Sequence, residues 1–378
     1  MSSVKYKGKL ALVASYAPSL INFRGKLIEA AISDGWDVIV LAPDFDAETL
    51  EKVRRLGAKP CSYVLQRTGM NPFSDLSALW SIYKVFKHEC PSVVLSYTIK
   101  PVLYASLAAY AAKTRGVYSM ITGLGFSFSG AGWKQRLASK VTLILFKRAL
   151  LYNQKVFFQN PDDRKLFEEK QLLQKEKSVL INGSGVDTTY FSPVPLPNQP
   201  RFLMIARLLR EKGIYEYIEA ARLVKQRYPD ITFNLAGWVD EGSTSVKEQR
   251  LDEWINEGVI HFLGKLDDVR PALAECSVYV LPSYREGTPR TVLEAMAMGR
   301  AIITTDVPGC RETIVDGKEG LLVEAKNIEA LSSAMMRVVE NYALVADMGR
   351  RSRARAEEKY DVNHVNQSIL KTLDAKVD

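Results

Sequence analysis

Short apolar runs rich in Val, Ile and Leu recur along the first half of the chain, and longer segments with helical spacing separate them. The runs occupy residues 10–14, 38–42, 92–96 and 117–121. Continuous apolar strands that alternate with helices are typical of a parallel sheet with helices on both faces. The hydrophobic pattern therefore predicts an α/β domain.

The alternation stops near the middle of the chain and then begins again. Residues 182–200 contain four prolines and two glycines, a composition typical of a linker. After it, the pattern predicts strands at residues 201–206, 231–236, 259–263, 278–281 and 301–304, and helices that include 213–227 and 289–298. A second α/β domain is therefore expected.

We expect an N-terminal domain over residues 1–185, a linker over 186–200, a C-terminal domain over 201–345 and a helical segment over 346–378. The position of the last segment suggests that it packs back across the first domain. Ligands of such sheets bind beyond the carboxyl ends of the strands. Two domains that face each other would hold a ligand in the cleft between them.

The segment after the strand at 278–281 predicts a helix N-terminus suited to an anion. Thr288 is a favourable N-cap residue, and Pro289 suits the first helical position. The free amides and the dipole of a helix beginning near residue 289 would bind a phosphate, and Gly287 would let the backbone approach it closely. The sequence therefore predicts a phosphate site at this helix.

Two glutamates flank the predicted site, because Glu286 precedes the helix and Glu294 lies within it. Eight helical residues span ~12 Å, so the carboxylates would lie near the two ends of a bound diphosphate. One would hold a sugar hydroxyl and the other a ribose. In isolation, such a pair would more often be one residue that favours the helix dipole and one surface residue, but the strand–loop–helix context favours a site.

Two cations follow the first strand of the C-terminal domain. Arg207 and Lys212 lie on a loop at the carboxyl end of that strand, where they could neutralise a diphosphate leaving group. The alternative is a basic loop that is simply solvated.

Composition excludes several classes of protein. The chain has 378 residues, 47% hydrophobic and 25% charged, as in ordinary globular proteins. Its cysteines are too few for a disulfide framework and form no CxxC pair: Cys61, Cys90, Cys276 and Cys310. No apolar stretch is long enough to span a membrane. Lys5, Lys7 and Lys9 before the run 10–14 resemble a short signal peptide, but a buried first strand is the favoured interpretation.

Charge is divided unevenly. Residues 1–196 carry a net charge of +11 and residues 197–378 carry −3. No acidic residue occurs between Glu89 and Asp162, whereas nine cations do. A basic surface favours nucleic acid, anionic lipid or phosphorylated substrates. No zinc-finger spacing, aromatic RNA-binding motif or helix-turn-helix pattern is present, so we do not expect nucleic acid as a partner.

The segment 132–148 within this acid-free window predicts a basic amphipathic helix. Several of its cations lie off one helix face, and its apolar residues fall near that face: Trp133, Leu137, Val141, Ile144 and Leu145. Such a helix can lie in a membrane interface, or it can face the core with a solvated basic side. Asp44 and Asp46 match a metal-binding DxD pattern but are expected in a surface loop, and no metal is expected.

The motifs of the C-terminal half together resemble retaining glycosyltransferases of family four. Glu286 to Glu294 matches that family's E-x7-E motif, and ARLLREKG at 206–213 resembles its Arg…Lys-Gly loop. HFLGKLDDV at 261–269 and NGSGVD at 182–187 resemble two further motifs in the same order. The family implies a GT-B fold, which consists of two facing Rossmann-like domains with parallel sheets and an interdomain cleft.

SYTIKP at 96–101 and ITGLGF at 121–126 are similar to a bacterial subgroup of that family. Its members add sugars, often N-acetylhexosamines, to undecaprenyl-diphosphate-linked saccharides of O-antigen, capsule or lipid-linked glycan assembly. Many relatives carry an active-site histidine in the N-terminal domain. None of His88, His261 and His364 lies in the 118–128 loop, so no histidine role is assigned.

The resemblance implies a nucleotide-sugar donor, which we expect to be UDP-linked. It also implies retention of the anomeric configuration and no separate cofactor. The implied catalytic residues are Arg207, Lys212 and Glu286, and the implied donor-binding residues are Glu294, Gly287, Thr288, Pro289, Leu263 and Gly264. The candidate acceptor-binding residues are Lys100, Gly123, Gly125, Asn22 and Arg24.

The expected acceptor is a lipid-linked saccharide, and the expected place of action is the inner face of the cytoplasmic membrane, with the basic N-terminal domain on an anionic surface. Three alternatives remain open at this point. A UDP-sugar 2-epimerase shares the architecture but needs no acceptor, a glycosyltransferase could use a soluble acceptor, and a non-catalytic sugar-nucleotide-binding subunit would have no turnover.

Overall fold

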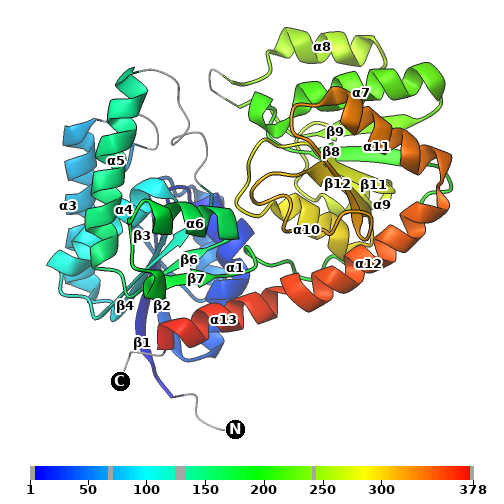
Figure 1. Cartoon of the computed structure of the whole chain (residues 1–378). Coiled ribbons are helices and arrows are strands. Elements are labelled where there is room, and N and C mark those ends of the chain that lie inside the picture. The colour runs from blue at the N-terminus through cyan, green and yellow to red at the C-terminus, as the bar shows by residue number, and fades with distance from the viewer. Residues whose placement is uncertain (1–4, 67–70, 124–132, 241–243, 375–378) are drawn as a thin grey trace. The chain divides into compact units, whose positions relative to one another are not determined.

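The computed structural model describes residues 5–66, 71–123, 133–240 and 244–374 (Figure 1). The chain divides into two compact units. The first consists of Met1–Ser184 with Asn363–Asp378, and the second of Gly185–Val362.

The described strands of the first unit form a seven-stranded parallel sheet in the order β3-β2-β1-β4-β5-β6-β7. They are β1 (Gly8–Val13), β2 (Trp36–Ala42), β3 (Lys59–Ser62), β4 (Val93–Tyr97), β5 (Gly116–Ile121), β6 (Lys155–Phe158) and β7 (Ser178–Leu180). The helices are α1 (Pro18–Ser33), α2 (Ala47–Arg55), α3 (Pro72–Glu89), α4 (Ile99–Ala111), α5 (Trp133–Leu151), α6 (Pro161–Glu169) and α13 (Val362–Asp374), with a 3-10 turn at Lys175–Lys177.

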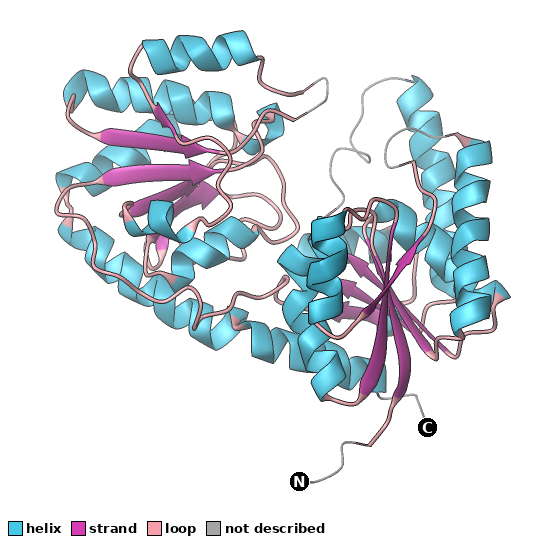
Figure 2. Cartoon of the chain, turned by 180° about the vertical axis from the view of Figure 1, so that it is seen from behind, coloured by secondary structure: helices cyan, strands magenta, loops and turns pink. Residues whose placement is uncertain are grey.

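Both faces of this sheet are buried, which explains the continuous apolar runs. Successive strand residues point to opposite faces. Leu10 and Leu12 of β1 therefore join a cluster with α1 and α13, while Ala11 and Val13 join a second cluster with α3, α4, α5 and α6. Figure 2 shows helices on both faces of the strands.

The described strands of the second unit form a six-stranded parallel sheet in the order β10-β9-β8-β11-β12-β13. They are β8 (Arg201–Ile205), β9 (Thr232–Ala236), β10 (His261–Phe262), β11 (Val278–Leu281), β12 (Ala301–Thr305) and β13 (Gly320–Val323). The helices are α7 (Ile214–Arg227), α8 (Glu248–Asn256), α9 (Arg270–Ala274), α10 (Arg290–Ala297), α11 (Ile328–Glu340) and α12 (Ala343–Tyr360).

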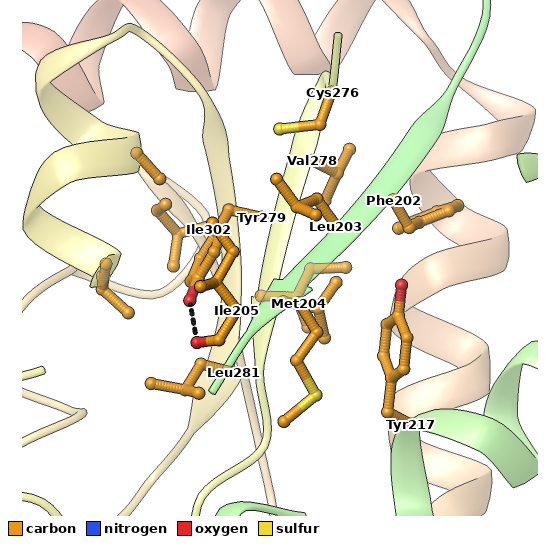
Figure 3. Packing of buried hydrophobic residues seen from close by; sticks show 14 of the residues in the cluster. Phe202, Leu203, Met204, Ile205, Tyr217, Cys276, Val278, Tyr279, Leu281 and Ile302 are labelled. Atoms are coloured by element: carbon orange, nitrogen blue, oxygen red, sulfur yellow. Dashed lines mark hydrogen bonds between the residues drawn. The ribbon is translucent and has the colours of Figure 1, made fainter. Parts of the chain in front are cut away.

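The centre of the second unit is an apolar core whose few hydroxyl groups are hydrogen-bonded internally. The rings of Phe202 and Phe233 stack with centroids 4.8 Å apart. Tyr279 Oη donates to the carbonyl of Ile205 at 3.0 Å, which satisfies a buried hydroxyl and links β11 to the end of β8 (Figure 3). These contacts fix the strands whose ends carry the candidate site.

The strand and helix predictions are largely confirmed, with differences at several boundaries. The first helix begins at Pro18, so the acceptor candidates Asn22 and Arg24 both lie inside it. The final helical stretch is two helices, because Asp361 takes an extended conformation with ψ 129° between α12 and α13. Helix α13 lies in the core of the first unit through Val365 and Ile369, whereas α12 packs on α10 of the second unit.

Residues 186–200 pack on the second unit. Val186 and Phe191 belong to its core, and Arg300 donates to the carbonyl of Val194 at 3.2 Å. Val186 also exchanges backbone hydrogen bonds with Tyr360 and Val362. The proline-rich stretch is therefore anchored at both of its ends.

Glu89 at the end of α3 ties two strands of the first unit together. Its nearly buried carboxylate accepts from Lys59 at 2.7 Å, from Lys9 at 3.1 Å and from His88 at 2.9 Å. The hydrogen bond from Lys59, the largest contribution, lowers the pKa of Glu89 from 4.5 to about 2. A lowered pKa contributes stability above pH 4.5 that is lost as the pH falls toward 2.

We therefore expect Glu89→Gln to destabilise the first unit by about 2 kcal/mol at pH 7. The difference in melting temperature between wild type and variant should shrink as the pH falls below 4.5, because the carboxylate then gains a proton in the unfolded wild-type chain while it stays charged in the folded one. Thermal unfolding at pH 7, 4 and 3 measures this. A difference that is constant over that range would contradict the ionic role.

Candidate active site

The candidate site lies at the carboxyl edge of the second sheet, where the loops after β8, β9, β10, β11 and β12 meet. All pairs in this sheet are parallel, so these loops leave the same edge. Tyr284 N in the β11 loop donates to the carbonyl of Glu211 in the β8 loop at 2.9 Å. The two loops that carry the predicted catalytic residues are therefore joined directly.

Lys212 and Glu286, two of the three predicted catalytic residues, form an ion pair. Lys212 Nζ lies 2.5 Å from Glu286 Oε1, and Ser283 Oγ donates to the same oxygen at 2.8 Å. Both charged side chains are largely buried. A pair that is shielded from water but still reachable is suited to exchanging partners when an anion binds.

Gly213 explains how Lys212 reaches this position. It adopts φ 77°, and a Cβ there would lie 2.1 Å from the carbonyl oxygen of Pro282. Glycine alone fits this left-handed position and close approach. It turns the chain from the 3-10 turn Arg210–Lys212 into α7 and presses the lysine loop onto the β11 loop.

The turn at residues 308–312, after β12, packs against the backbone of Glu286. It was not predicted from the sequence. Glu286 N donates to the carbonyl of Pro308 at 3.0 Å. Gly309, at φ 85°, would place a Cβ 2.3 Å from the Glu286 carbonyl oxygen and 2.6 Å from that of Gly287. Its amide donates to Glu312 Oε2 at 2.7 Å. The Pro308-Gly309 dipeptide was the available turn signal.

Helix α12 holds this turn in place. The carbonyl of Glu312 accepts from Lys359 Nζ at 3.1 Å, from Arg355 at 3.3 Å and from the hydroxyl of Tyr360. A continuous set of contacts therefore runs from α12 through the 308–312 turn to Glu286.

The helix-start prediction is wrong by one residue. Pro289, not Thr288, holds the N-cap position of α10, because its ψ of 110° is extended and Arg290 is the first helical residue. Pro289 provides no side-chain cap. Residues 286–289 are outside the helix, so the all-helical spacing of ~12 Å does not apply to the two glutamates. Gly287 and Pro289 are buried and Thr288 is half-buried.

Glu294 lies inside α10 and is only 7% exposed. Its Oε1 accepts from Arg290 Nε at 2.8 Å. Burial raises the pKa of Glu294, while Arg290 opposes that rise and Asp268 adds to it.

Arg207 and the β10 loop line the same edge. Arg207 pairs with Asp240 of the β9 loop at 2.8 Å, so the structure joins it to that loop. Leu263 N donates to the carbonyl of Leu235, and the Gly264 carbonyl accepts from Gly237, both at 2.8 Å. Leu263 is exposed, and a Cβ added at Gly264 would meet nothing within 4 Å. The donor-binding candidates after β10 are thus accessible.

The candidate acceptor residues of the first unit have different environments. Lys100 is engaged by Asp75 at 3.0 Å and by the carbonyl of Gln66 at 2.8 Å. Asn22 is exposed on α1, and Gly123 follows β5 with φ 117°. Gly125 lies outside the described residues.

Arg24 does not fit a direct acceptor contact. It is 2% exposed and donates to Met120 Sδ at 2.8 Å and to Ser184 Oγ at 3.2 Å. Its guanidinium lies 5.0 Å from the centre of the Tyr97 ring. The side chain is a buried link between α1, β4 and β5, and its neighbours in the sequence do not predict that burial.

Among the described residues, no group of three or more His, Cys, Asp or Glu is arranged to hold a metal ion. Asp44 and Asp46 instead accept from the backbone amides of Ala17 and Thr49, at 2.8 and 2.7 Å. Cys61, Cys90, Cys276 and Cys310 are free thiols. Within the described part of the chain, no helix has the length and apolar character that crossing a membrane requires.

Comparison with known proteins decides the family. Residues 187–355 match the family Glycosyl transferases group 1. The whole chain is 30% identical to the N,N'-diacetylbacillosaminyl-diphospho-undecaprenol alpha-1,3-N-acetylgalactosaminyltransferase of Campylobacter jejuni, over 97% of this chain and 98% of that protein. The chain belongs to the group 1 glycosyltransferases. A second relative, the UDP-Gal:alpha-D-GlcNAc-diphosphoundecaprenol alpha-1,3-galactosyltransferase of Escherichia coli, is 24% identical over 71% of this chain and 72% of its own length.

Solved structures show the GT-B fold for this glycosyltransferase. Anabaena HepE in complex with UDP and glucose aligns with a TM-score of 0.79 at 18% identity, over 97% of this chain and all of that one. Sucrose-phosphate synthase from Thermosynechococcus elongatus aligns with a TM-score of 0.77 at 18% identity, over 97% and 98% of the two chains. The predicted fold class and enzyme class are confirmed.

Proposed function

We propose that this glycosyltransferase moves a sugar from a UDP-linked donor to a saccharide carried on undecaprenyl diphosphate, with retention of configuration. The full-length similarity to the Campylobacter jejuni enzyme supports the acceptor class, since it extends across both units. The observation that carries the chemistry is the shielded Lys212–Glu286 pair at the carboxyl edge of the second sheet.

The proposed reaction exchanges one bond for another at the anomeric carbon. The bond from that carbon to the donor phosphate breaks, and a bond from the acceptor oxygen forms on the same face. The departing phosphate oxygen takes the proton of the acceptor hydroxyl, so no protein base is needed. Lys212 and Arg207 stabilise the diphosphate as negative charge develops on it.

Glu286 and Glu294 are assigned different duties in this proposal. When the diphosphate recruits Lys212, Glu286 is released from the ion pair and can accept a hydrogen bond from a donor-sugar hydroxyl. Glu294 holds the ribose hydroxyls. The main-chain amides near Gly287 and Thr288 approach the phosphates, and Leu263 and Gly264 border the base. The reaction is proposed to need no cofactor.

The acceptor is assigned to the first unit, with Lys100, Gly123 and Asn22 as its candidate contacts. Lys100 would have to exchange Asp75 for the acceptor diphosphate. Since the acceptor is a membrane lipid, we place the enzyme at the inner face of the cytoplasmic membrane, with the net charge of +11 in residues 1–196 favouring an anionic surface.

The deciding experiment incubates the purified protein with single UDP-sugars, with and without undecaprenyl-diphosphate saccharides, and measures released UDP. Acceptor-dependent release with one preferred donor would support the proposal, and the anomeric coupling constant of the NMR spectrum of the product tests retention. UDP release that does not require an acceptor would favour a 2-epimerase. Equal release with a free saccharide would favour a soluble acceptor.

Glu294→Gln is expected to weaken UDP binding by about tenfold, because a charged acceptor of two ribose hydroxyls is replaced by an amide. The fold should tolerate the change, since the amide oxygen of glutamine can still accept the hydrogen bond from Arg290 Nε. Calorimetric titration with UDP measures the affinity, and thermal unfolding checks the fold. Glu329→Gln, at an exposed position in the first turn of α11, is the matched control and should bind UDP like wild type. Unchanged affinity in Glu294→Gln would contradict the ribose assignment.

A further inference from the structure

Three large apolar side chains are exposed in a row on α3. Phe73, Leu76 and Trp80 are 86%, 65% and 53% exposed, and their spacing of three and four residues places them on one helix face. The opposite face is buried through Ala78 and Ile82. Contiguous exposed apolar surface marks an interaction site, and the three residues span ~10 Å of helix.

The same face continues into cations. Lys84 and Lys87 are exposed one and two turns beyond Trp80, and Lys84 Nζ lies 5.6 Å from the centre of the Trp80 ring. The two carboxylates of α3 are occupied, since Asp75 binds Lys100 and Glu89 binds Lys9 and Lys59. The α3 face, defined as Phe73, Leu76, Trp80, Lys84 and Lys87, therefore has an apolar end and a cationic end.

Helix α5 repeats this combination beside the same sheet face. Its described side chains begin at Thr142, and they include exposed Ile144 and Leu145 followed by exposed Lys147 and Arg148. Helices α3, α4 and α5 bury residues in one cluster, and α3 and α5 both pack against α4. Both stand at the outer edge of the first unit in Figure 1.

We propose that the α3 face docks the enzyme on an anionic lipid bilayer. Phe73, Leu76 and Trp80 enter the interfacial layer, where tryptophan is favoured, and Lys84 and Lys87 contact anionic headgroups. This proposal rests on the lipid-linked acceptor of the proposed function. It places the principal contact on α3, outside the 132–148 segment that the sequence predicted.

The combination of charges and apolar groups favours a bilayer over a protein partner. A bilayer presents a uniform anionic surface, so a protein face that binds it needs cations beside an apolar strip. It does not need a particular pattern of opposite charges. Docking by cations alone would be lost at high salt, whereas inserted apolar side chains keep part of the affinity. The α3 face has both components.

The test is flotation of the full-length protein with phosphatidylglycerol-containing vesicles and with phosphatidylcholine vesicles. The variant Phe73→Ser/Leu76→Ser/Trp80→Ser should bind the anionic vesicles on the order of 100-fold more weakly. The matched control replaces exposed apolar residues of the second unit, Val194→Ser/Ile255→Ser/Val315→Ser, and should bind like wild type.

The charged part is tested separately. Lys84→Gln/Lys87→Gln should weaken binding to anionic vesicles by about tenfold at low salt and should leave phosphatidylcholine binding unchanged. Lys247→Gln/Lys318→Gln, two exposed lysines of the second unit, is its control. Wild-type vesicle binding by the triple serine variant would overturn the proposal.

Activity separates this inference from the proposed function. With a water-soluble short-prenyl-diphosphate saccharide, the triple serine variant should release UDP like wild type, and with an undecaprenyl acceptor in vesicles it should be slower. If wild type uses neither acceptor, but binds vesicles that the triple serine variant does not bind, the proposed function fails and the docking surface stands. If wild type binds no vesicles and instead self-associates through this face, in sedimentation experiments, the surface joins two copies and the proposal is wrong.

Discussion

Lys212→Ala is expected to lower the turnover number by about a thousandfold. The lysine is the partly buried cation held at the carboxyl edge of the second sheet, and its ammonium already lies 2.5 Å from an anionic oxygen of Glu286. A donor diphosphate would replace that partner. Because charge on the leaving group grows toward the transition state, loss of a positioned cation affects the chemical step more than donor binding.

The same loop supplies the control for Lys212. Arg210 lies two residues away in the same 3-10 turn and is exposed, with its guanidinium 5.8 Å from the centre of the Tyr215 ring. Arg210→Ala should keep turnover within about threefold of wild type. Lys212→Arg should recover part of the activity, since the charge returns with a different shape. UDP release at saturating donor and acceptor measures all three variants, and near-normal turnover in Lys212→Ala would remove this residue from the mechanism.

Much of this site could be predicted because its signals are local. The Lys-Gly pair before α7 and the Glu-Gly-Thr-Pro segment before α10 each follow an apolar strand, and parallel strands bring such loops to one edge. The pairing of Lys212 with Glu286 agrees with that prediction. The four missed strands, β3, β6, β7 and β13, are short, and all of them lie at or next to a sheet edge, where no long apolar run is required.

The remaining features depend on contacts that sequence spacing does not show. Arg24 was expected near an acceptor, but the fold buries it against Tyr97 and Met120. Lys100 was predicted as an anion ligand, and its partner Asp75 lies 25 residues earlier on α3. The exposed α3 face was not predicted from the sequence, because the charges of its lysines are balanced there by two acidic residues, Asp75 and Glu89. Only tertiary structure shows that other residues neutralise both.

The backbone under Glu286 depends on Gly309. A side chain at Gly309 would need a left-handed φ of 85° and would lie 2.3 Å from the Glu286 carbonyl oxygen, well inside contact distance. The neighbouring atoms are main chain, so they cannot turn away as a flexible side chain could. The turn itself is fixed by Glu312 and by the α12 residues that bind the Glu312 carbonyl. The Glu286–Gly287 segment would therefore have to move.

Gly309→Ala is accordingly expected to lower turnover by at least ~100-fold and to destabilise the second unit by about 3 kcal/mol. Gly317→Ala separates the two causes, because Gly317 is also left-handed, at φ 74°, but an added Cβ meets nothing within 4 Å. That control variant should lose about 1 kcal/mol of unfolding free energy through conformational strain, and its turnover should be unchanged. Urea unfolding and UDP release measure both variants. If Gly309→Ala were as active as Gly317→Ala, the position of Glu286 would not depend on this turn, and the contacts from α12 to Glu286 would have a structural role alone.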